Sequence, residues 1–389
     1  MDDGDTVDRG LRFSMTEGQK AVQEVARAFV EKELRPVVMQ YDESQEFPSP
    51  VIEKLAGLGF MGITWPEELG GAGLTDLETV VIIEELARVD PSVALTVASH
   101  NSLCTGHIML HGSEEQKKRF VPDLASGKKL GAWGLTEPGS GSDAGGMKTV
   151  AKKQGGDWIL SGSKTFITQG SVGSTYVIMA LTDPSRGRHG ISSFILERGM
   201  KGFTVGKKEN KLGMRSSDTA TLLFDGVRVP AANLIGEEGD GFRQAMGVLD
   251  GGRVGIAALS VGIAQGALDA SIKYAQERAQ FGKPIGEFQA IQWKLADMAT
   301  EISASRLLTH KAAWLKMNRR PYTVAASQAK YFASEAAVRA ANEAVQIHGG
   351  YGFIKEFPVE KLYRDVKLMT IGEGTSEVQK MIIARELLK

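Results

Sequence analysis

Two changes of residue pattern along the chain limit its possible folds more than any other feature. Up to Gly127, apolar residues recur every three or four positions, as in "EGQKAVQEVARAFVEKELRPV", which predicts amphipathic helices. From Lys128 the runs are short, and several, such as "DWILSGSKTFIT", alternate apolar and polar residues between turn residues, which predicts strands. After Pro230, long alanine-rich stretches predict helices again.

This order predicts an α+β multidomain fold. We expect an N-terminal helical domain (1–127), a middle antiparallel, barrel-like β domain (128–232) and a C-terminal four-helix bundle (233–389). Pro36 should end the first helix, because proline removes a backbone hydrogen bond and clashes with the preceding turn. "QGGD" at 154–157 predicts a hairpin turn between two strands.

Composition and charge argue against several classes of protein. The 389 residues carry 46 Lys and Arg against 47 Asp and Glu, a net charge of -1, which disfavours nucleic-acid binding through a basic surface. The single cysteine, Cys104, cannot form an intrachain disulfide and favours a reducing compartment. "MDDGDTVDRG" lacks the apolar core of a signal peptide, and no apolar run is expected to span a membrane. We therefore expect a cytoplasmic protein without membrane insertion.

A glycine-rich loop follows the first predicted strand. "GSGSDA", Gly139 to Ala144, matches the G-x-G-x-x-A form of the dinucleotide-binding fingerprint, which requires a helix after it. The next residues, "GGMKTVAKK", alternate like a strand, so the match is not a Rossmann signal. From the residues alone the loop is either an exposed linker or a set of amides and hydroxyls for a phosphate or flavin edge.

Other chemistry has weaker signals. In "RAQFGKPIGEFQ", Arg278 and Phe281 either end a helix with a favourable cation or bind a pyrophosphate and an adenine, and the residues alone favour the helix end. His100, His107 and His111 cluster in one segment but form no metal-binding motif, so we expect no metal site.

One carboxylate near the C-terminus lies between two glycines. In "TIGEGTSEVQK", Glu373 precedes a predicted helix, and Ser376 and Gln379 have the spacing of a capping box. Flanking glycines leave the carboxylate unshielded and allow the backbone to approach another molecule closely.

Taken together, the motifs resemble the acyl-CoA dehydrogenase family, FAD-dependent enzymes of fatty-acid and amino-acid oxidation. The resemblance runs from about residue 13 onward and rests on motifs in family order: "GLTEPGSGSD", "GSKTFITQG", "KLGMRSSDTATLLFDGVRVP", "GEEGDGF", "ERAQFGKPIGEFQAIQ", "QIHGGYGF", "LYRDVK" and "GEGTSEVQ". It implies the same α–β–α architecture, a homotetramer, and FAD shared across a subunit interface.

The resemblance also implies a role for Glu373. The residue matches the family's catalytic base, which takes the α-proton of an acyl-CoA thioester while a β-hydride passes to flavin N5, giving a trans-2-enoyl-CoA. The glutamate's own backbone N–H and a ribityl hydroxyl of FAD polarise the thioester carbonyl in the family. We expect burial to raise the pKa of the carboxyl toward neutrality, against the effect of the following helix N-terminus.

Cofactor and substrate residues are carried over position by position. The residues that match flavin contacts in the same chain are Leu135, Thr136, Gly141, Ser142, Phe166 and Thr168. The residues that match contacts reaching FAD from the neighbouring subunit are Arg278, Gln280, Phe281, Phe288 and Gln289. The positions that match the pyrophosphate turn and the adenosine side are Gln346, Gly349, Gly350, Thr375 and Glu377. The positions that match the CoA and thioester channel are Ser142, Asp250, Arg253, Gly374 and Arg385.

Three positions bear on the acyl group. Gly252 stands where some long-chain and branched-chain members have an alternative catalytic glutamate, which supports Glu373 as the base. Gly372 stands where many straight-chain enzymes have tyrosine, which leaves room for branching, and Ser99 stands where deeper pockets have glutamate. We expect a short to medium acyl-CoA, straight or lightly branched.

The leading hypothesis is thus a dehydrogenase that passes electrons to an electron-transfer flavoprotein. An acyl-CoA oxidase is a second hypothesis, although such enzymes usually have an extra C-terminal helical domain. A third is a non-catalytic, DNA-protecting protein of the same fold, although that offshoot has a basic C-terminal extension and this chain ends in "IIARELLK".

Overall fold

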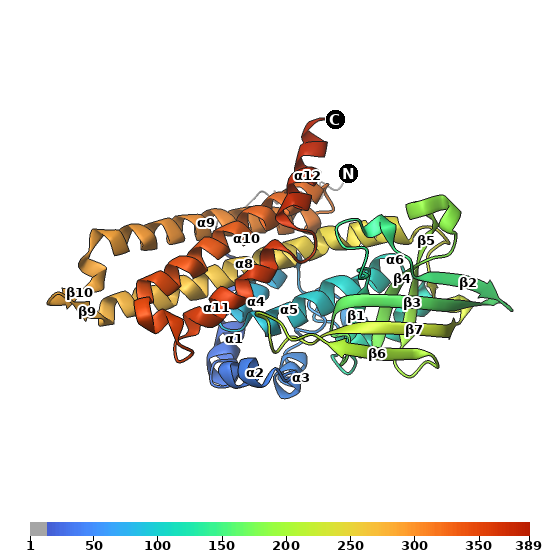
Figure 1. The fold of residues 1–389 in the computed structure, drawn as a ribbon, viewed down its shortest axis with the longest axis horizontal. Helices are drawn as coiled ribbons and strands as arrows, with labels where there is room; N and C mark the ends of the chain where they lie inside the picture. The colour runs from blue at the N-terminus through green and yellow to red at the C-terminus, as the bar shows by residue number, and fades with distance from the viewer. Residues whose placement is uncertain (1–13) are drawn as a thin grey trace, which may run out of the picture.

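The computed structural model describes residues 14–389 and forms an elongated molecule with a β domain at one end (Figure 1). The N-terminal stretch "MDDGDTVDRG" lies outside the described residues. The N-terminal helices are α1 (Glu17–Phe29), α2 (Val38–Ser44), α3 (Ser49–Gly57), α4 (Asp76–Ala87), α5 (Pro91–Ser99), α6 (Gly106–His111) and α7 (Glu114–Ala125).

Local sequence determines where several of these helices begin and end. Capping boxes start α1 at Thr16, α4 at Thr75 and α7 at Ser113, where each side chain and the residue three positions later satisfy free backbone N–H groups. After α1, a π-helical turn runs over Val30–Leu34 and stops before Pro36, as the sequence predicts.

The middle domain is a single mixed sheet. Its strands are β1 (Gly131–Gly134), β2 (Val150–Gln154), β3 (Asp157–Thr168), β4 (Thr175–Leu181), β5 (Ile191–Glu197), β6 (Phe203–Lys208), β7 (Thr219–Val229) and β8 (Leu234–Ile235), in the order β6-β7-β3-β2-β4-β5-β8. Most neighbours are antiparallel, as expected, but β1 and β2 both pair with β4 in parallel, because at least one further strand lies between each of them and β4 in the chain and allows the crossover.

The predicted hairpin turn is confirmed. Gln154 pairs with Asp157, and the two residues between them, Gly155 and Gly156, have φ values of 59° and 88°. Two successive left-handed residues make the type of turn that matches the twist of an antiparallel pair.

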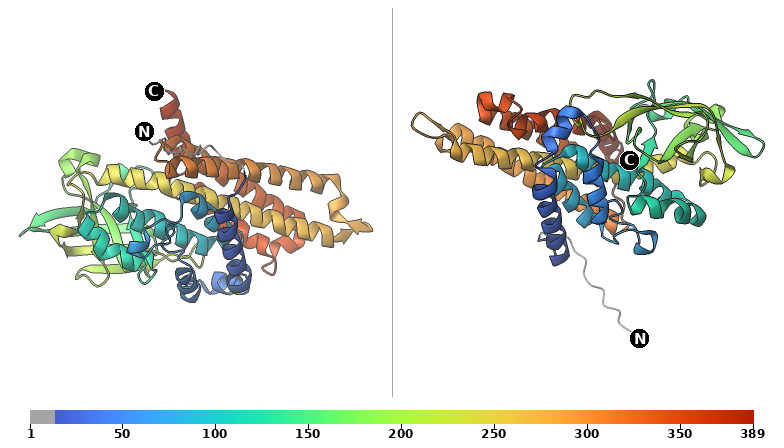
Figure 2. Two further views of the ribbon diagram at one scale, coloured as in Figure 1. Left: turned by 180° about the vertical axis from the view of Figure 1, so that it is seen from behind. Right: turned by 90° about the horizontal axis from the view of Figure 1, so that it is seen from below.

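The C-terminal domain consists of long helices. It contains α8 (Gly241–Glu277), α9 (Gln289–Met317), α10 (Thr323–His348), α11 (Pro358–Val366) and α12 (Ser376–Leu387), and a small hairpin of β9 (Ala279–Gln280) and β10 (Lys283–Pro284) joins α8 to α9. The expected bundle is formed by α8, α9, α10 and the shorter α11, whereas α12 projects from it with the C-terminus at its tip (Figures 1 and 2).

Helix α8 is the central element of the molecule. Its small residues allow α4 to pack against its backbone: a β-carbon at Gly262 would lie 2.4 Å from the carbonyl oxygen of Glu84, and one at Gly266 would lie 2.2 Å from that of Arg88. Contrary to the sequence prediction, α8 is long and apolar enough to cross a membrane, but 72% of its most apolar window is buried inside the molecule. A buried core helix passes the same length test, so α8 is weak evidence for a membrane span.

A cluster of buried charges on α11 joins the three domains. Lys361 is 2% exposed, and its Nζ donates to Oδ1 of Asp90 at 2.9 Å and to Oδ2 of Asp365 at 2.5 Å. Asp365 also accepts from the backbone N–H of Met214 in the β domain at 2.5 Å, and Arg364 pairs with Asp42 at 2.8 Å. These contacts fix the relative positions of the helices and the sheet around the site described next.

Candidate active site

Glu373 lies in a strained turn between α11 and α12. Its φ is 54° and that of Gly374 is 94°, so both residues have left-handed backbone. This conformation costs free energy for a residue with a side chain and is found most often at functional sites, where the surrounding structure enforces it.

The predicted capping box at this turn is wrong. Thr375 is the N-cap of α12, with its Oγ1 accepting from the N–H of Val378 at 3.3 Å. Ser376 instead donates to Glu335 at 2.6 Å, and Gln379 turns inward, where its Nε2 donates to the carbonyl oxygens of Glu373 at 3.3 Å and Gly374 at 2.9 Å. Tertiary contacts therefore use the two side chains that sequence spacing assigned to the helix end.

Glu373 is half-buried, and its Oε2 is buried without a hydrogen-bond partner. A β-carbon at Gly252 would lie 1.9 Å from Oε2, so the carboxylate lies directly against the α8 backbone. Burial raises the pKa of Glu373 to about 7, although the positive charges of Arg253 and Lys330 oppose this shift. A carboxylate with this pKa is suited to accept a proton at neutral pH.

The predicted substrate residues on α8 lie beside this carboxylate. Arg253 is buried, and its guanidinium pairs with Asp250, which also accepts from Thr323 Oγ1 at 2.6 Å. The Nε of Arg253 has no hydrogen-bond partner. Burial lowers the pKa of Arg253 and raises that of Asp250. Arg385 is different: it is exposed on α12 and pairs with Glu386 at 3.4 Å.

The flavin-side residues predicted from the sequence come together at the ends of β1 and β3. The backbone N–H of Thr165 donates to the carbonyl oxygen of Thr136 at 2.9 Å, which places Leu135 and Thr136 next to the segment that holds Phe166 and Thr168. The Phe166 side chain is 65% exposed on left-handed backbone with φ 57°. Gly141 and Ser142 lie exposed on the loop that follows Thr136.

A buried ion pair that the sequence analysis missed supports this loop. Lys164, fully buried, donates to Oε1 of Glu137 at 2.7 Å and to the carbonyl oxygen of Leu135 at 3.1 Å. Burial lowers the pKa of Lys164 to about 8, and for Glu137 the attraction of Lys164 and its hydrogen bonds outweigh burial and lower the pKa. A lysine at an inward position of a strand, between buried residues, was the available signal.

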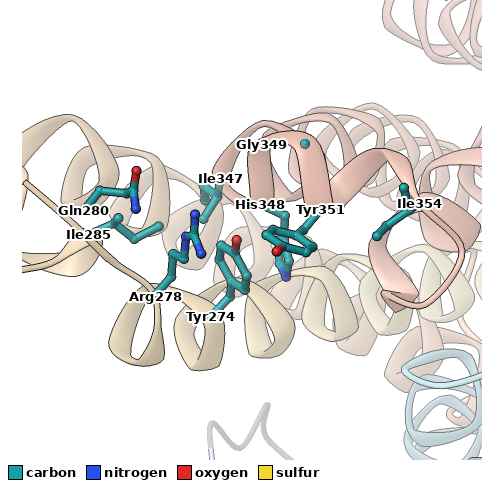
Figure 3. Close-up of a pocket in the computed structure, with 10 residues that line it drawn as sticks. Tyr274, Arg278, Gln280, Ile285, Ile347, His348, Gly349, Tyr351 and Ile354 are labelled. Atoms are coloured by element: carbon teal, nitrogen blue, oxygen red, sulfur yellow. The ribbon is translucent and has the colours of Figure 1, made fainter.

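A second group of predicted cofactor residues surrounds a pocket of about 460 Å³ at the far end of α8 (Figure 3). The Arg278 guanidinium lies 5.4 Å above the Tyr351 ring, and Tyr274 stacks on His348 with ring centroids 4.3 Å apart. Arg278 is also the C-cap of α8, so the two sequence interpretations of this residue are compatible. The lining residues are Tyr274, Arg278, Gln280, Ile285, Ile347, His348, Gly349, Gly350, Tyr351 and Ile354.

The remaining predicted cofactor residues lie in several separate places. Phe281 is 95% exposed and packs edge-on against Phe288, at 6.1 Å between centroids, beside the pocket. Gln289 and Gln346 are exposed at the start of α9 and the end of α10. Thr375 and Glu377 belong to the Glu373 turn. The tyrosines of the pocket, Tyr274 and Tyr351, were not predicted.

The two groups lie far apart within one chain. Gly252 touches Glu373, and Arg278 lies 26 residues farther along the same continuous helix, which is about 39 Å at 1.5 Å per residue. In Figure 1 the β9–β10 hairpin and the β domain are accordingly at opposite ends of the molecule. One ligand cannot contact both groups of a single chain.

Two of the three clustered histidines have hydrogen-bond partners, whereas His111 packs edge-on against the His107 ring and its Nε2 has none. His100 Nε2 lies 3.0 Å from the carbonyl oxygen of Leu124 and its Nδ1 accepts from Gly131, while Nδ1 of His107 accepts from Trp133 at 3.0 Å. Within residues 14–389, no group of three or more His, Cys, Asp or Glu side chains is arranged to hold a metal ion.

Comparison with known proteins identifies the family. Models of the acyl-CoA dehydrogenase N-terminal, middle and C-terminal domains match residues 16–128, 132–227 and 239–388. The chain belongs to the acyl-CoA dehydrogenase family. It is an FAD-dependent oxidoreductase, and the predicted family and fold class are confirmed.

Individual relatives cover nearly the whole chain. A short-chain acyl-CoA dehydrogenase of Clostridium acetobutylicum is 45% identical over 97% of this chain and 100% of its own length. The structure of butyryl-CoA dehydrogenase from Megasphaera elsdenii superposes with a TM-score of 0.96, at 46% identity, over 97% of this chain and 100% of that one. A subunit of the caffeyl-CoA reductase–Etf complex of Acetobacterium woodii is 47% identical over 96% of this chain and 99% of its own length.

The two groups of site residues fit FAD. At Gly349 and Gly350 a β-carbon would meet no other atom, so the open backbone beside the Arg278 cation suits a pyrophosphate, and the aromatic rings suit an adenine. The loop after β1, with Thr136 and Ser142, and the exposed ring of Phe166 suit the flavin end. Within one chain the Arg278 pocket lies about 39 Å along α8 from the residue that contacts Glu373, and the flavin-side loop lies in the β domain at the opposite end of the molecule.

Proposed function

We propose that this protein oxidises short to medium acyl-CoA thioesters to trans-2-enoyl-CoA, with Glu373 as the catalytic base. The observation that carries the proposal is the Glu373 carboxylate: Oε2 is buried without a hydrogen-bond partner, at a pKa of about 7. Burying a carboxylate oxygen without a partner costs free energy, and such costs are typical of functional sites.

The proposed reaction balances at two carbon atoms. The α C–H bond breaks and its proton passes to Glu373, the β C–H bond breaks with loss of a hydride, and a C=C bond forms between the two carbons. When bound, FAD supplies the acceptor for that hydride. Within residues 14–389 the backbone N–H of Glu373 donates to no acceptor, which leaves it available to polarise the thioester carbonyl and acidify the α-proton.

The geometry near Gly372 supports the substrate range. A β-carbon there would make ordinary contacts with Leu368 from 3.5 Å, so a side chain would fit at this position and its absence leaves that volume free. Ser99 is buried, and its Oγ lies 3.3 Å from Oε1 of Gln169, whose Nε2 donates to the carbonyl oxygen of Thr96. We propose that straight or lightly branched acyl groups occupy this region.

The proposed partners follow from the relatives and from the separation of the cofactor residues. A relative named as part of an Etf complex supports an electron-transfer flavoprotein as the acceptor. The division of the FAD residues between the two ends of the chain supports a homo-oligomer, which we propose to be a tetramer. The domain boundaries and the cytoplasmic location stay predictions.

Anaerobic titration of the flavin-loaded protein with butyryl-, isobutyryl-, hexanoyl- and octanoyl-CoA tests the proposal. We expect bleaching of the flavin absorbance by at least one thioester, and none with Glu373→Gln. A yellow protein that no thioester bleaches would contradict the substrate class. Bleaching that persists in Glu373→Gln would exclude this residue as the base, and rapid oxygen consumption during turnover would favour an acyl-CoA oxidase.

The reverse direction is a second candidate, because one relative is named a caffeyl-CoA reductase. Glu373 would then deliver its proton to the α-carbon of an enoyl-CoA, and the reduced flavin, when bound, would supply the hydride that the β-carbon needs. Reoxidation of the prereduced protein by an enoyl-CoA, faster than bleaching by the matching acyl-CoA at equal concentration, would support reduction as the main activity.

A further inference from the structure

Lys330 on α10 is a buried cation without a direct ionic partner. The residue is 0% exposed, and its Nζ donates to the carbonyl oxygen of Gly374 at 2.8 Å. In the described part of the chain, no carboxylate lies within 4.0 Å of this ammonium, whereas the buried Lys164 and Lys361 are both paired with carboxylates. Burying an ammonium without an ion pair is costly, so a purely structural role does not account for it.

The Gly374 carbonyl is the point where two helices hold the Glu373 turn. It accepts from Lys330 on α10 and, at 2.9 Å, from Gln379 on α12. Gln379 also donates to the Glu373 carbonyl at 3.3 Å. With both carbonyls held from this side, the left-handed turn keeps the N–H of Glu373 free of protein acceptors.

We propose that Lys330 is a positioning residue for the reaction. Its ammonium fixes the Gly374 carbonyl, and so the direction of the Glu373 carboxylate and N–H, and its charge favours the carboxylate form over the acid. This inference rests on the function proposed above.

Several charged groups surround Glu373 and Lys330. Arg253 on α8 adds a second positive charge beside Glu373, and Asp250 neutralises part of it. Glu335 on α10 and Glu377 on α12 act on the Lys330 side. Burial lowers the pKa of Lys330 to about 8, and attraction to Glu373 opposes this shift.

These charges determine the direction in which Lys330 shifts the pKa of Glu373. The Lys330 cation lowers the pKa of Glu373, which burial has raised to about 7. A neutral residue at position 330 therefore raises the pKa of Glu373 further, and the base stays protonated to higher pH.

Three variants separate the charge from the hydrogen bond. Lys330→Met removes both, Lys330→Gln removes the charge but keeps an N–H donor, and Lys330→Arg keeps the charge. Each is loaded with FAD, and the rate of anaerobic bleaching by the best thioester is measured from acid to alkaline pH. We expect the midpoint of the rate to rise by about one pH unit in the Met and Gln variants. We also expect the limiting rate at high pH to fall at least about tenfold in the Met variant and less in the Gln variant.

A second readout does not depend on turnover. The difference in unfolding temperature between proteins with Glu373 and with Glu373→Gln, followed against pH without thioester, reports the titration of Glu373. In the Lys330→Met background this titration should move to higher pH, and in Lys330→Arg it should stay close to wild type. If Lys330→Met does not fold, the Gln and Arg variants still give the comparison.

Lys361→Met is the matched control, because it removes a buried lysine that is fully paired. It should lower the unfolding temperature and leave the midpoint of the rate unchanged. Unchanged midpoints in both Lys330→Met and Lys330→Gln would overturn the inference and leave Lys330 a structural residue. If the wild type is not bleached, or if Glu373→Gln bleaches equally fast, the proposed function fails instead.

Discussion

Two clusters of buried charged residues in this molecule contain the same residue types but differ in how these residues are paired. Around Lys361, the ammonium meets the carboxylates of Asp90 and Asp365 at 2.9 and 2.5 Å. Around Glu373, one carboxylate oxygen has no partner, and the ammonium of Lys330 bonds a carbonyl instead of the carboxylate. The paired cluster joins three domains, whereas the unpaired one contains the carboxylate that we propose as the proton acceptor. Pairing, more than burial, distinguishes the structural charges from the proposed catalytic one.

The largest expected effect is on the unpaired cluster. Glu373→Gln should reduce the rate of anaerobic flavin bleaching by about 10³- to 10⁴-fold, because the general base is lost while shape is kept. Stopped-flow absorbance measures the rate, and thermal unfolding checks that the variant is folded. A less than tenfold loss would mean that the unpaired carboxylate is not the base.

A change in the paired cluster around Lys361 should alter the stability of the protein. Lys361→Met leaves Asp90 and Asp365 buried without their cation and should lower the free energy of unfolding by about 3–5 kcal/mol. Urea denaturation measures this loss. The folded fraction should bleach with an unchanged pH midpoint. A shifted midpoint would show that the two clusters are coupled and would weaken the distinction between them.

The third prediction tests the contact between the Glu373 carboxylate and the backbone of α8. Gly252→Ala places a β-carbon where Oε2 now lies, so we expect the carboxylate to move and the bleaching rate to fall by about 10²-fold. Gly247→Ala, on the exposed side of α8 where a β-carbon meets no atom, is the matched control. It should leave the rate unchanged and raise stability by about 0.5–1 kcal/mol. Equal rates in the two variants would contradict the geometry.

The smallest expected effect is on the pH dependence of stability. The folded pKa of Glu373, about 7, lies above its ordinary value of 4.5, so the folded state binds the proton more tightly. The folding free energy that Glu373 contributes through this tighter proton binding is therefore fully present below pH 4.5, and it is lost as the pH rises through about 7. Glu373→Gln should stabilise the protein by about 1–3 kcal/mol above that range and by less below it. If Glu373→Gln stabilised the protein equally below pH 4.5 and above pH 7, the carboxylate would not be desolvated.

Much of the fold and part of the site could be predicted from local sequence. Apolar periodicity predicted the order of domains, and Gly155 and Gly156 predicted their turn, because these depend on neighbouring residues. The Ser376–Gln379 capping box failed, because its side chains have stronger partners on α10 and in the Glu373 turn. The apolar length of α8 was also misjudged, since nothing local separates a core helix from a membrane helix.

The sequence by itself determined the α–β–α order and the position of Glu373 between two glycines before a helix. The tertiary structure decided what that carboxylate contacts, Gly252 on α8, and which charges act on it, those of Arg253 and Lys330. These residues lie 121, 120 and 43 positions before Glu373 in the chain. Desolvation and charge pairing set the pKa of a buried group, and both depend on which distant residues the fold brings together, so no local pattern can specify them.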